Sequence, residues 1–146
     1  MTSSVSLIPC TPHHRPILDE WFDRGDIRIE QEIPIGMPSE EFVDILLGKS
    51  EAVYLIYCDA YPVGVVALVK QEDGYFQVPI QIAATYYRGN GIGKEALRIV
   101  TELHPDKNLV QKIRPCNARM LALSRRVGFV DKGVEGEYVR LERVGV

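Results

Sequence analysis

The chain has 146 residues, a net charge of −3, 46% hydrophobic residues and 25% charged residues. This length suits one domain with a single core, which we predict over residues 1–146, and the ordinary composition excludes a low-complexity or fibrous chain. The three cysteines are scattered and form no CxxC pair, which argues against a disulfide framework and for a reducing compartment. No apolar span is long enough for a membrane helix and no signal peptide is encoded, so a cytoplasmic protein without membrane insertion is expected.

Charge is distributed unevenly along the chain. Residues 19–44 hold nine carboxylates and two arginines, whereas residues 111–146 hold eight lysines and arginines against four carboxylates. Either this is solvated surface, or the basic part attracts an anionic cofactor and the acidic part a cationic acceptor. No basic stripe with interleaved aromatic residues occurs, so nucleic-acid binding is not predicted.

The N-terminal part predicts a strand followed by two helices. Val5 to Pro9 suits a strand, and a helix follows with Thr11 as its N-cap and Gly25 at its end. A loop over residues 33–38 leads to a second helix, which Ser39 is expected to cap. The buried stripe of this second helix is predicted to contain Phe42, Ile45 and Leu46.

Strands dominate the middle of the chain. Two β-branched apolar runs, residues 52–58 and 63–70, are separated by a turn and predict a hairpin. Asp73-Gly74 then turns the chain into a third run, which predicts one strand from Tyr75 to Ala84.

The most informative segment is a glycine loop, Arg88-Gly89-Asn90-Gly91-Ile92-Gly93-Lys94. It lies between the strand expected over residues 75–84 and an amphipathic helix expected over Ile92 to Leu103. Glycines let the backbone approach a bulky anion, and the helix that follows directs its free N–H groups and positive dipole end at that anion. A phosphate-bearing cofactor is therefore expected.

Three motifs compete for this loop. A phosphate-binding Walker loop needs Ser or Thr after Gly93-Lys94, where Glu95 stands, and a glycine at position 88. A dinucleotide fingerprint needs an acidic residue after the next strand, near residues 109–113, and none follows there. The pattern Arg-x-x-Gly-x-Gly is matched completely, although a glycine-rich turn without a ligand remains the plain alternative.

A second segment, residues 117–129, reads Asn-Ala-Arg-Met-Leu-Ala-Leu-Ser-Arg-Arg-Val-Gly-Phe. Together with the glycine loop, one helix and one strand earlier, it resembles the signatures of the GCN5-related N-acetyltransferases. The resemblance covers roughly residues 53–139. The order of the expected elements gives a mixed α/β (α+β) fold, with about four helices and a twisted, mostly antiparallel sheet of about seven strands. The resemblance adds a V-shaped cofactor cleft. The last two strands are expected near residues 129–132 and 137–142.

The resemblance also implies the cofactor, acetyl-coenzyme A, and the residues that bind it. The pantetheine arm would pair like an extra strand with the edge of the fourth strand, and the pyrophosphate would lie on backbone N–H groups of the glycine loop. Arg88 either contacts a phosphate or braces the loop, and Asn117 either bonds to the coenzyme or caps a helix. The predicted cofactor-binding residues are Gln81, Ile82, Ala83, Ala84, Arg88, Gly89, Asn90, Gly91, Ile92, Gly93, Lys94 and Asn117.

The catalytic groups are harder to assign from the sequence than the cofactor-binding residues. Many relatives carry a tyrosine that protonates the coenzyme sulfur at the position where this chain has Ser124. Tyr86, Tyr87 or Tyr138, or solvent, are alternatives as the acid. The strand over residues 76–84 contains no carboxylate to act as base. The acidic loop with Glu30, Glu32 and the region of Asp26 could supply one, and Glu30 and Glu32 are candidates for binding the acceptor amine. The histidines lack metal-ligand spacing, and no metal is predicted.

The function that follows is direct transfer of an acetyl group from acetyl-coenzyme A to a primary amine of a small molecule or a peptide. The alternatives are an acyl-coenzyme A sensor, or a catalytically weak or degenerate protein of the same fold. Many members of this fold self-associate, so a homodimer is also among the expectations.

Overall fold

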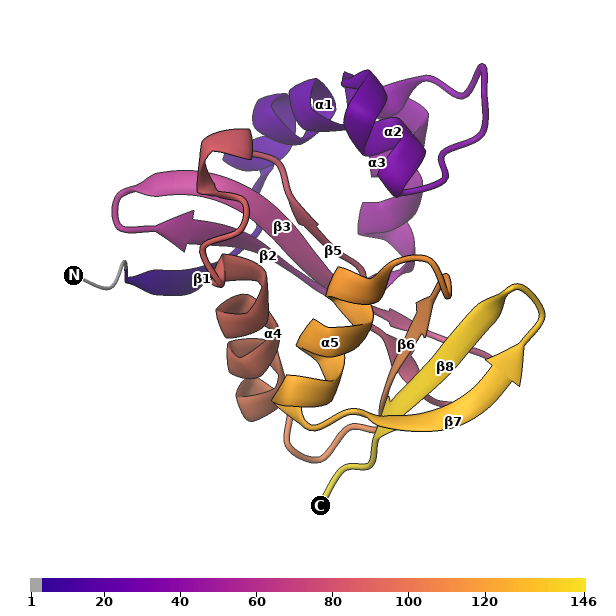
Figure 1. Ribbon diagram of the computed structural model, residues 1–146. Coiled ribbons are helices and arrows are strands. Elements are labelled where there is room, and N and C mark those ends of the chain that lie inside the picture. Colours follow the sequence, from indigo (N-terminus) through magenta and orange to yellow (C-terminus); the bar gives the residue numbers. More distant parts are fainter. Residues whose placement is uncertain (1–3) are drawn as a thin grey trace.

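The computed structural model describes residues 4–146, where helices and strands alternate along the chain (Figure 1). The α-helices are α1 (Arg15–Asp23), α2 (Gly25–Glu30), α3 (Ser39–Lys49), α4 (Ile92–Leu103) and α5 (Ala118–Val127). The strands are β1 (Val5–Pro9), β2 (Ser50–Cys58), β3 (Tyr61–Lys70), β4 (Phe76–Gln77), β5 (Ile80–Ile82), β6 (Leu109–Ile113), β7 (Val130–Glu135) and β8 (Tyr138–Arg143).

The strands form one sheet in the order β1-β2-β3-β4-β6-β8-β7, with β5 paired to β3. All pairs are antiparallel except β4 with β6, which is parallel. The mixed α/β class and the mostly antiparallel sheet are therefore confirmed.

The single strand predicted over residues 75–84 is divided by Pro79. Proline has no N–H to donate to a ladder, and its ring fixes φ, so a strand is interrupted there. β4 ends at Gln77 and β5 begins at Ile80. The Pro79 carbonyl still accepts a hydrogen bond from the Ala67 N–H at 3.0 Å, so both segments stay beside β3.

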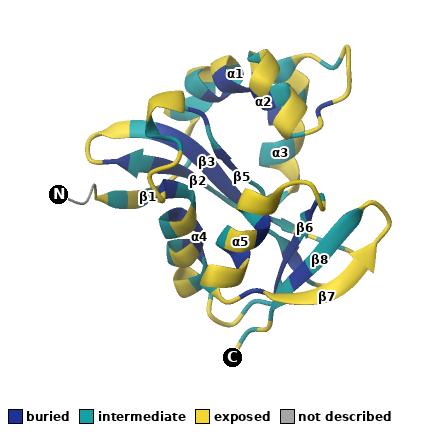
Figure 2. Cartoon of the chain, in the orientation of Figure 1, coloured by how far each residue is buried: buried dark blue, intermediate teal, exposed yellow. Residues whose placement is uncertain are grey.

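Helices cover both faces of the sheet (Figures 1 and 2). One hydrophobic cluster joins α1, α2 and α3 to the face of β3 that carries Val65, and a second joins α4 and α5 to the face that carries Val66. The central strand β3 is buried along most of its length, whereas every residue of β7 is exposed (Figure 2). Within residues 4–146 no helix has both the length and the apolar composition to cross a membrane.

The structure corrects three predictions in the N-terminal part. Gly25 does not end the first helical region but begins α2, because the chain bends at the extended residue Arg24 and then turns helical again. Pro38 is the N-cap of α3, and Ser39 is its first helical residue. The buried residue of α3 is Val43, while Ile45 is 38% exposed.

The predicted elements in the C-terminal part are confirmed with few changes. α4 and β6 have the expected bounds, and α5 begins after Asn117. Gly128 ends α5 with φ +112°, which favours glycine, and Phe129 is buried in the core.

His104, at the C-terminal end of α4, ties this helix to β2. Its Nε2 lies 2.9 Å from the Tyr54 hydroxyl, and burial lowers the pKa of His104, with Lys107 adding to the effect. The folded state thus binds fewer protons than the unfolded state. The stability that this contributes is present above the ordinary pKa of about 6.5 and is lost as pH falls through the folded value.

The wild-type protein should therefore lose unfolding free energy when the pH falls from 7.5 to 5.5. We expect His104→Gln to lose up to about 1 kcal/mol less over the same range. Urea denaturation at the two pH values measures this. Equal pH dependence in the two proteins would contradict the assignment.

Candidate functional site

The sheet opens where β4 gives way to β5. β4 pairs with β6 only at Phe76 and Gln77, and the Val78 N–H still reaches the Val110 carbonyl at 3.3 Å. Beyond this point β5 pairs only with β3, whereas β6 continues alongside β8. One edge of β5 is therefore without a strand partner among residues 4–146.

Alternation along β5 determines which backbone groups face that open edge. The Ala83 N–H and the Gln81 carbonyl are directed toward β3: the Ala83 N–H donates to Val63 at 2.8 Å, and a Cβ on Gly64 would lie 2.3 Å from the Gln81 carbonyl oxygen. The Ala83 carbonyl instead accepts from Arg24. Ala84 also donates to Val63. Of the predicted edge residues 81–84, only Ile82 thus presents both its N–H and its carbonyl to the open side, and Ile80 joins it.

The glycine loop lies beside this edge and leads into α4. Gly89 and Gly91 have φ +81° and +77°, a conformation that suits glycine, and Gly91 is the N-cap of α4. Among residues 4–146 no side chain caps this helix. The first N–H groups of α4 are therefore left to an anion, as the sequence predicts.

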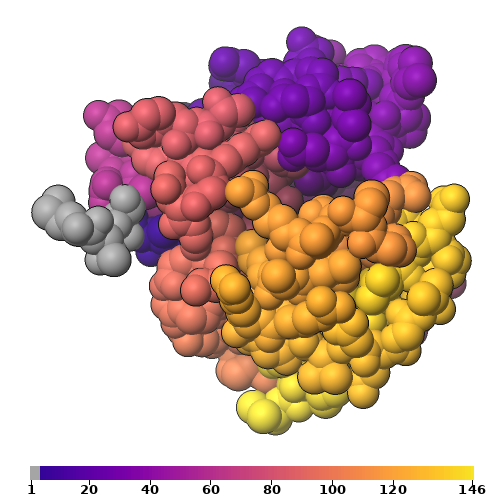
Figure 3. Space-filling view, in the orientation of Figure 1, coloured from indigo at the N-terminus to yellow at the C-terminus, as the bar shows by residue number. Residues whose placement is uncertain are grey.

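The start of α5 borders the same loop. Asn117 accepts the Met120 N–H through Oδ1 at 3.2 Å, so its capping role is present, and its Nδ2 remains a donor. Arg119, which sequence reasoning missed, lies with its Nη2 3.4 Å from the position of a Cβ on Gly89. Its guanidinium adds to the positive potential of the loop. Figure 3 shows the N-terminal helices, the loop region and α5 meeting at one surface.

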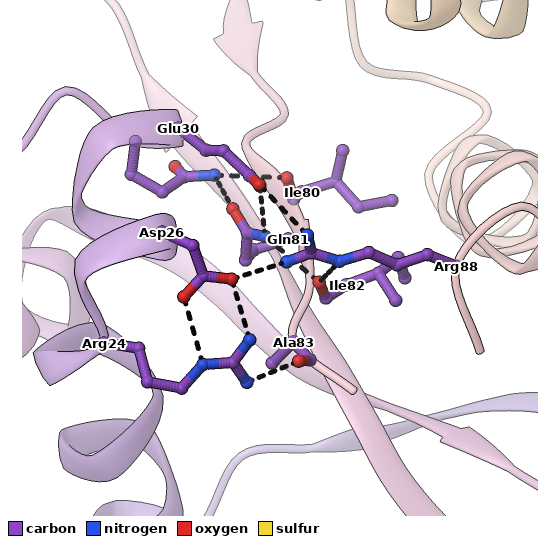
Figure 4. Close-up of polar contacts among 9 residues, drawn as sticks. Arg24, Asp26, Glu30, Ile80, Gln81, Ile82, Ala83 and Arg88 are labelled. Atoms are coloured by element: carbon purple, nitrogen blue, oxygen red, sulfur yellow. Dashed lines mark hydrogen bonds and ion pairs between the residues drawn. The ribbon is translucent and has the colours of Figure 1, made fainter. Parts of the chain in front are cut away.

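Side chains from α2 and the glycine loop cover the open edge of β5 in what we call the β5 edge network (Figure 4). Arg88 donates through Nε to the Ile82 carbonyl at 3.0 Å and forms ion pairs with Glu30 at 3.2 Å and Asp26 at 3.4 Å. The network consists of Arg24, Asp26, Glu30, Gln31, Gln81 and Arg88 together with the carbonyls of Ile80, Ile82 and Ala83. In this structure Arg88 therefore braces the loop.

Gln81 organises the network from within. Its side chain, on the face of the sheet that α2 covers, is 5% exposed. It donates to Glu30 at 2.7 Å and accepts from Gln31 at 2.7 Å. The predicted acceptor-site residue Glu30 is thus held next to β5 by a buried amide.

Asp26 is tied to Arg24 by two hydrogen bonds of 2.8 and 3.2 Å. These bonds lower the pKa of Asp26, and Arg88 adds a smaller effect. Arg24 also donates to the Ala83 carbonyl at 2.5 Å. The charged form of Asp26 is therefore stabilised, which makes Asp26 a weak proton acceptor.

Glu32 belongs to a separate cluster. It pairs with Arg114, which follows β6, and accepts from the Tyr138 hydroxyl at 3.0 Å. The Arg114 guanidinium stacks on the Tyr138 ring at 4.9 Å and is the main cause of the lowered pKa of Glu32. The structure thus separates Glu32 from Glu30, which the sequence grouped together.

A cavity of about 290 Å³ lies under the helices on the same face of the sheet as Gln81. Its walls are mostly aromatic and aliphatic, with three carboxamides, and are formed by Phe22, Gln31, Phe42, Leu46, Val65, Ala67, Val69, Gln77, Pro79, Ile80 and Gln81. Gln31 and Gln81 belong to both the cavity wall and the network. Among residues 4–146 no group of three or more His, Cys, Asp or Glu side chains is arranged to hold a metal ion.

Ser124 is completely buried on α5, and its hydroxyl has no hydrogen-bond partner among the described residues. Buried hydroxyls are normally paired, because an unpaired one keeps its desolvation cost. Two of the tyrosines named as alternative acids lie in different surroundings: the Tyr138 hydroxyl donates to Glu32, and Tyr86 is 87% exposed.

The chain has the fold of the GCN5-related N-acetyltransferases. Among solved structures, it is similar to the aminoglycoside acetyltransferase AAC(6')-Ib in complex with coenzyme A (TM-score 0.80, 20% identity, 97% of this chain and 95% of that one). It is also similar to the acetyltransferase of Salmonella typhimurium that modifies the N-terminal serine of ribosomal protein L7/L12 (TM-score 0.75, 18% identity, 97% and 95%). A third is the microcin C7 self-immunity acetyltransferase MccE in complex with acetyl-CoA and AMP (TM-score 0.71, 16% identity, 96% and 92%).

At the level of sequence, no protein-family model matches the chain and no curated protein matches it significantly. The similarity therefore rests on the fold.

Proposed function

We propose that this protein is an acetyl-coenzyme A-dependent N-acetyltransferase that acts on a primary amine of a small molecule or peptide. The observation that carries the proposal is the open edge of β5 next to an uncapped N-terminus of α4, reached through two left-handed glycines. An extended amide chain that ends in a pyrophosphate matches this pair of features.

The residues present fit such a cofactor. Backbone N–H groups of residues 89–94 would hold the pyrophosphate, with Lys94 and Arg119 adding positive charge. Ile80 and Ile82 would pair with the pantetheine amides, and Asn117 Nδ2 would donate to one of them. When bound, acetyl-coenzyme A supplies an acyl carbon that an amine can attack.

Glu30 is the best candidate for the base that deprotonates the acceptor ammonium. Asp26 and Glu32 have lowered pKa values because Arg24 and Arg114 hold them in the charged form. The only cationic partner of Glu30 among residues 4–146 is Arg88, which belongs to the glycine loop. Glu30, on α2, would then serve as the base, since the strand segment over residues 76–84 has no carboxylate.

The acceptor would lie on the face of the sheet that α1, α2 and α3 cover. The cavity there gives room for a small apolar or polar group beside Gln81, which bonds to Glu30, and its carboxamides offer donors and acceptors. The similar structures act, by their descriptions, on aminoglycosides and on a protein N-terminus, which supports an amine as the acceptor class.

Ser124 is proposed as a weak proton donor toward the coenzyme sulfur. We expect Ser124→Ala to lower kcat about 10-fold, below the usual range for a general acid because serine is a poor donor. Its free energy of unfolding should stay equal or rise, since an unpaired buried hydroxyl is removed. Steady-state kinetics with urea denaturation measures both, and an unchanged kcat would remove Ser124 from the mechanism.

A second candidate is a coenzyme-binding protein without turnover, which the absence of the usual tyrosine at position 124 favours. Thiol release from acetyl-coenzyme A, followed against polyamines, aminoglycosides, amino acids and N-terminal peptides with calorimetry in parallel, separates the two. Amine-dependent release supports the transferase. Tight binding without release from any amine supports the binding protein, and absence of binding to the folded protein contradicts both.

A further inference from the structure

Arg88 occupies the place where an extended ligand would pair with β5. The open edge offers two carbonyls, and both accept hydrogen bonds from side chains. Ile80 accepts from Gln31 at 3.3 Å, and Ile82 accepts from Arg88 at 3.0 Å and from Gln81 Nε2 at 3.1 Å. The Arg88 side chain is only 26% exposed, so it lies over the edge rather than in solvent. The Gln81 amide is buried under α2, so an incoming amide that donates to the Ile82 carbonyl needs the position held by Arg88 Nε.

We propose that Arg88 is an internal competitor of the coenzyme, and that coenzyme binding releases it from Ile82, Asp26 and Glu30. This inference rests on the proposed function and adds to it a coupling between the coenzyme site and the acceptor site. Arg88 is the first residue of the glycine loop, so an incoming pyrophosphate attracts its guanidinium away from the carboxylates. The same movement exposes the edge of β5.

Charge balance links this release to the acceptor. The β5 edge network holds two carboxylates, Asp26 and Glu30, and two guanidinium groups, Arg24 and Arg88. It is neutral while Arg88 is in place, and it has a charge of −1 once Arg88 leaves. A cationic amine then restores neutrality beside Glu30. Coenzyme binding therefore strengthens acceptor binding, and acceptor binding strengthens coenzyme binding by the same factor.

Neutralising one carboxylate weakens the hold on Arg88 and should favour the coenzyme. We expect Asp26→Asn and Glu30→Gln each to tighten coenzyme A binding about threefold to tenfold, the range for a partly exposed charge pair. The matched control is Asp23→Asn, which removes the same charge from an exposed residue of α1 outside the network. Its affinity should equal that of wild type. Isothermal titration calorimetry with coenzyme A alone measures all four proteins.

The position of Arg88 can also be followed directly. In ¹⁵N-labelled wild type the Arg88 Nε–H resonance, assigned by its loss in Arg88→Lys, should shift when coenzyme A is added. An unmoved resonance, or equal affinities in the two network variants and wild type, would overturn the competition while leaving coenzyme binding established. Failure of all the folded proteins to bind coenzyme A would instead overturn the proposed function and the competition together.

Discussion

Replacing Asn90 with glutamate is expected to weaken coenzyme A binding about 10- to 100-fold, which corresponds to about 1.4–2.8 kcal/mol. Asn90 is exposed and lies between Gly89 and Gly91, beside the uncapped N-terminus of α4. A carboxylate there faces the pyrophosphate and repels it, and it also competes for the free N–H groups of the helix. Calorimetric titration of coenzyme A measures the loss.

The control is Asn90→Gln, which has the size of glutamate without its charge. Its affinity is expected to stay within about twofold of wild type, because Asn90 is exposed and its side chain makes no hydrogen bond to another of residues 4–146. The gap between the two variants should shrink in 0.5 M salt as the charges are screened. Equal affinities of the glutamate and glutamine variants at low salt would place the pyrophosphate elsewhere.

Local patterns in the sequence were sufficient for the elements that hold the cofactor site. The bounds of α4 follow from the glycine loop before it and from its apolar periodicity, and Asn117 with Gly128 marks the two ends of α5. These signals lie within a few residues of what they determine. The interruption of the strand at Pro79 was readable by the same local rule but was not predicted.

The β5 edge network was not predictable in this way. Arg88 is 58 residues from Glu30 and 62 from Asp26, and Gln31 is 50 from Gln81. Such pairs depend on how α2 is placed over β5. That placement depends on the bend at Arg24 and on the hydrogen bond from the Arg24 side chain to the Ala83 carbonyl, 59 residues away. The sequence indicated an acidic loop near the acceptor. Only the tertiary structure separates Glu30, beside β5, from Glu32, beside β6 and β8.

That separation gives the second prediction. Glu30→Gln is expected to lower kcat about 10²- to 10⁴-fold, because glutamine keeps the size of the side chain but cannot accept the ammonium proton. The acid limb of the pH profile of kcat/KM, which reports ionisation of the base, should disappear in this variant. Steady-state kinetics between pH 5 and 9, with the amine found in the thiol-release assay, measures both effects.

Two comparisons keep this test specific. Glu20→Gln, the same change on an exposed residue of α1, should leave kcat unaltered, and Glu32→Gln should lower it far less, since Arg114 keeps Glu32 a weak base. Misfolding of Glu30→Gln would weaken coenzyme binding, whereas release of Arg88 strengthens it, so a low kcat together with a tighter coenzyme complex identifies a lost base. A kcat close to wild type, or an acid limb that persists, would mean that another group or solvent removes the proton.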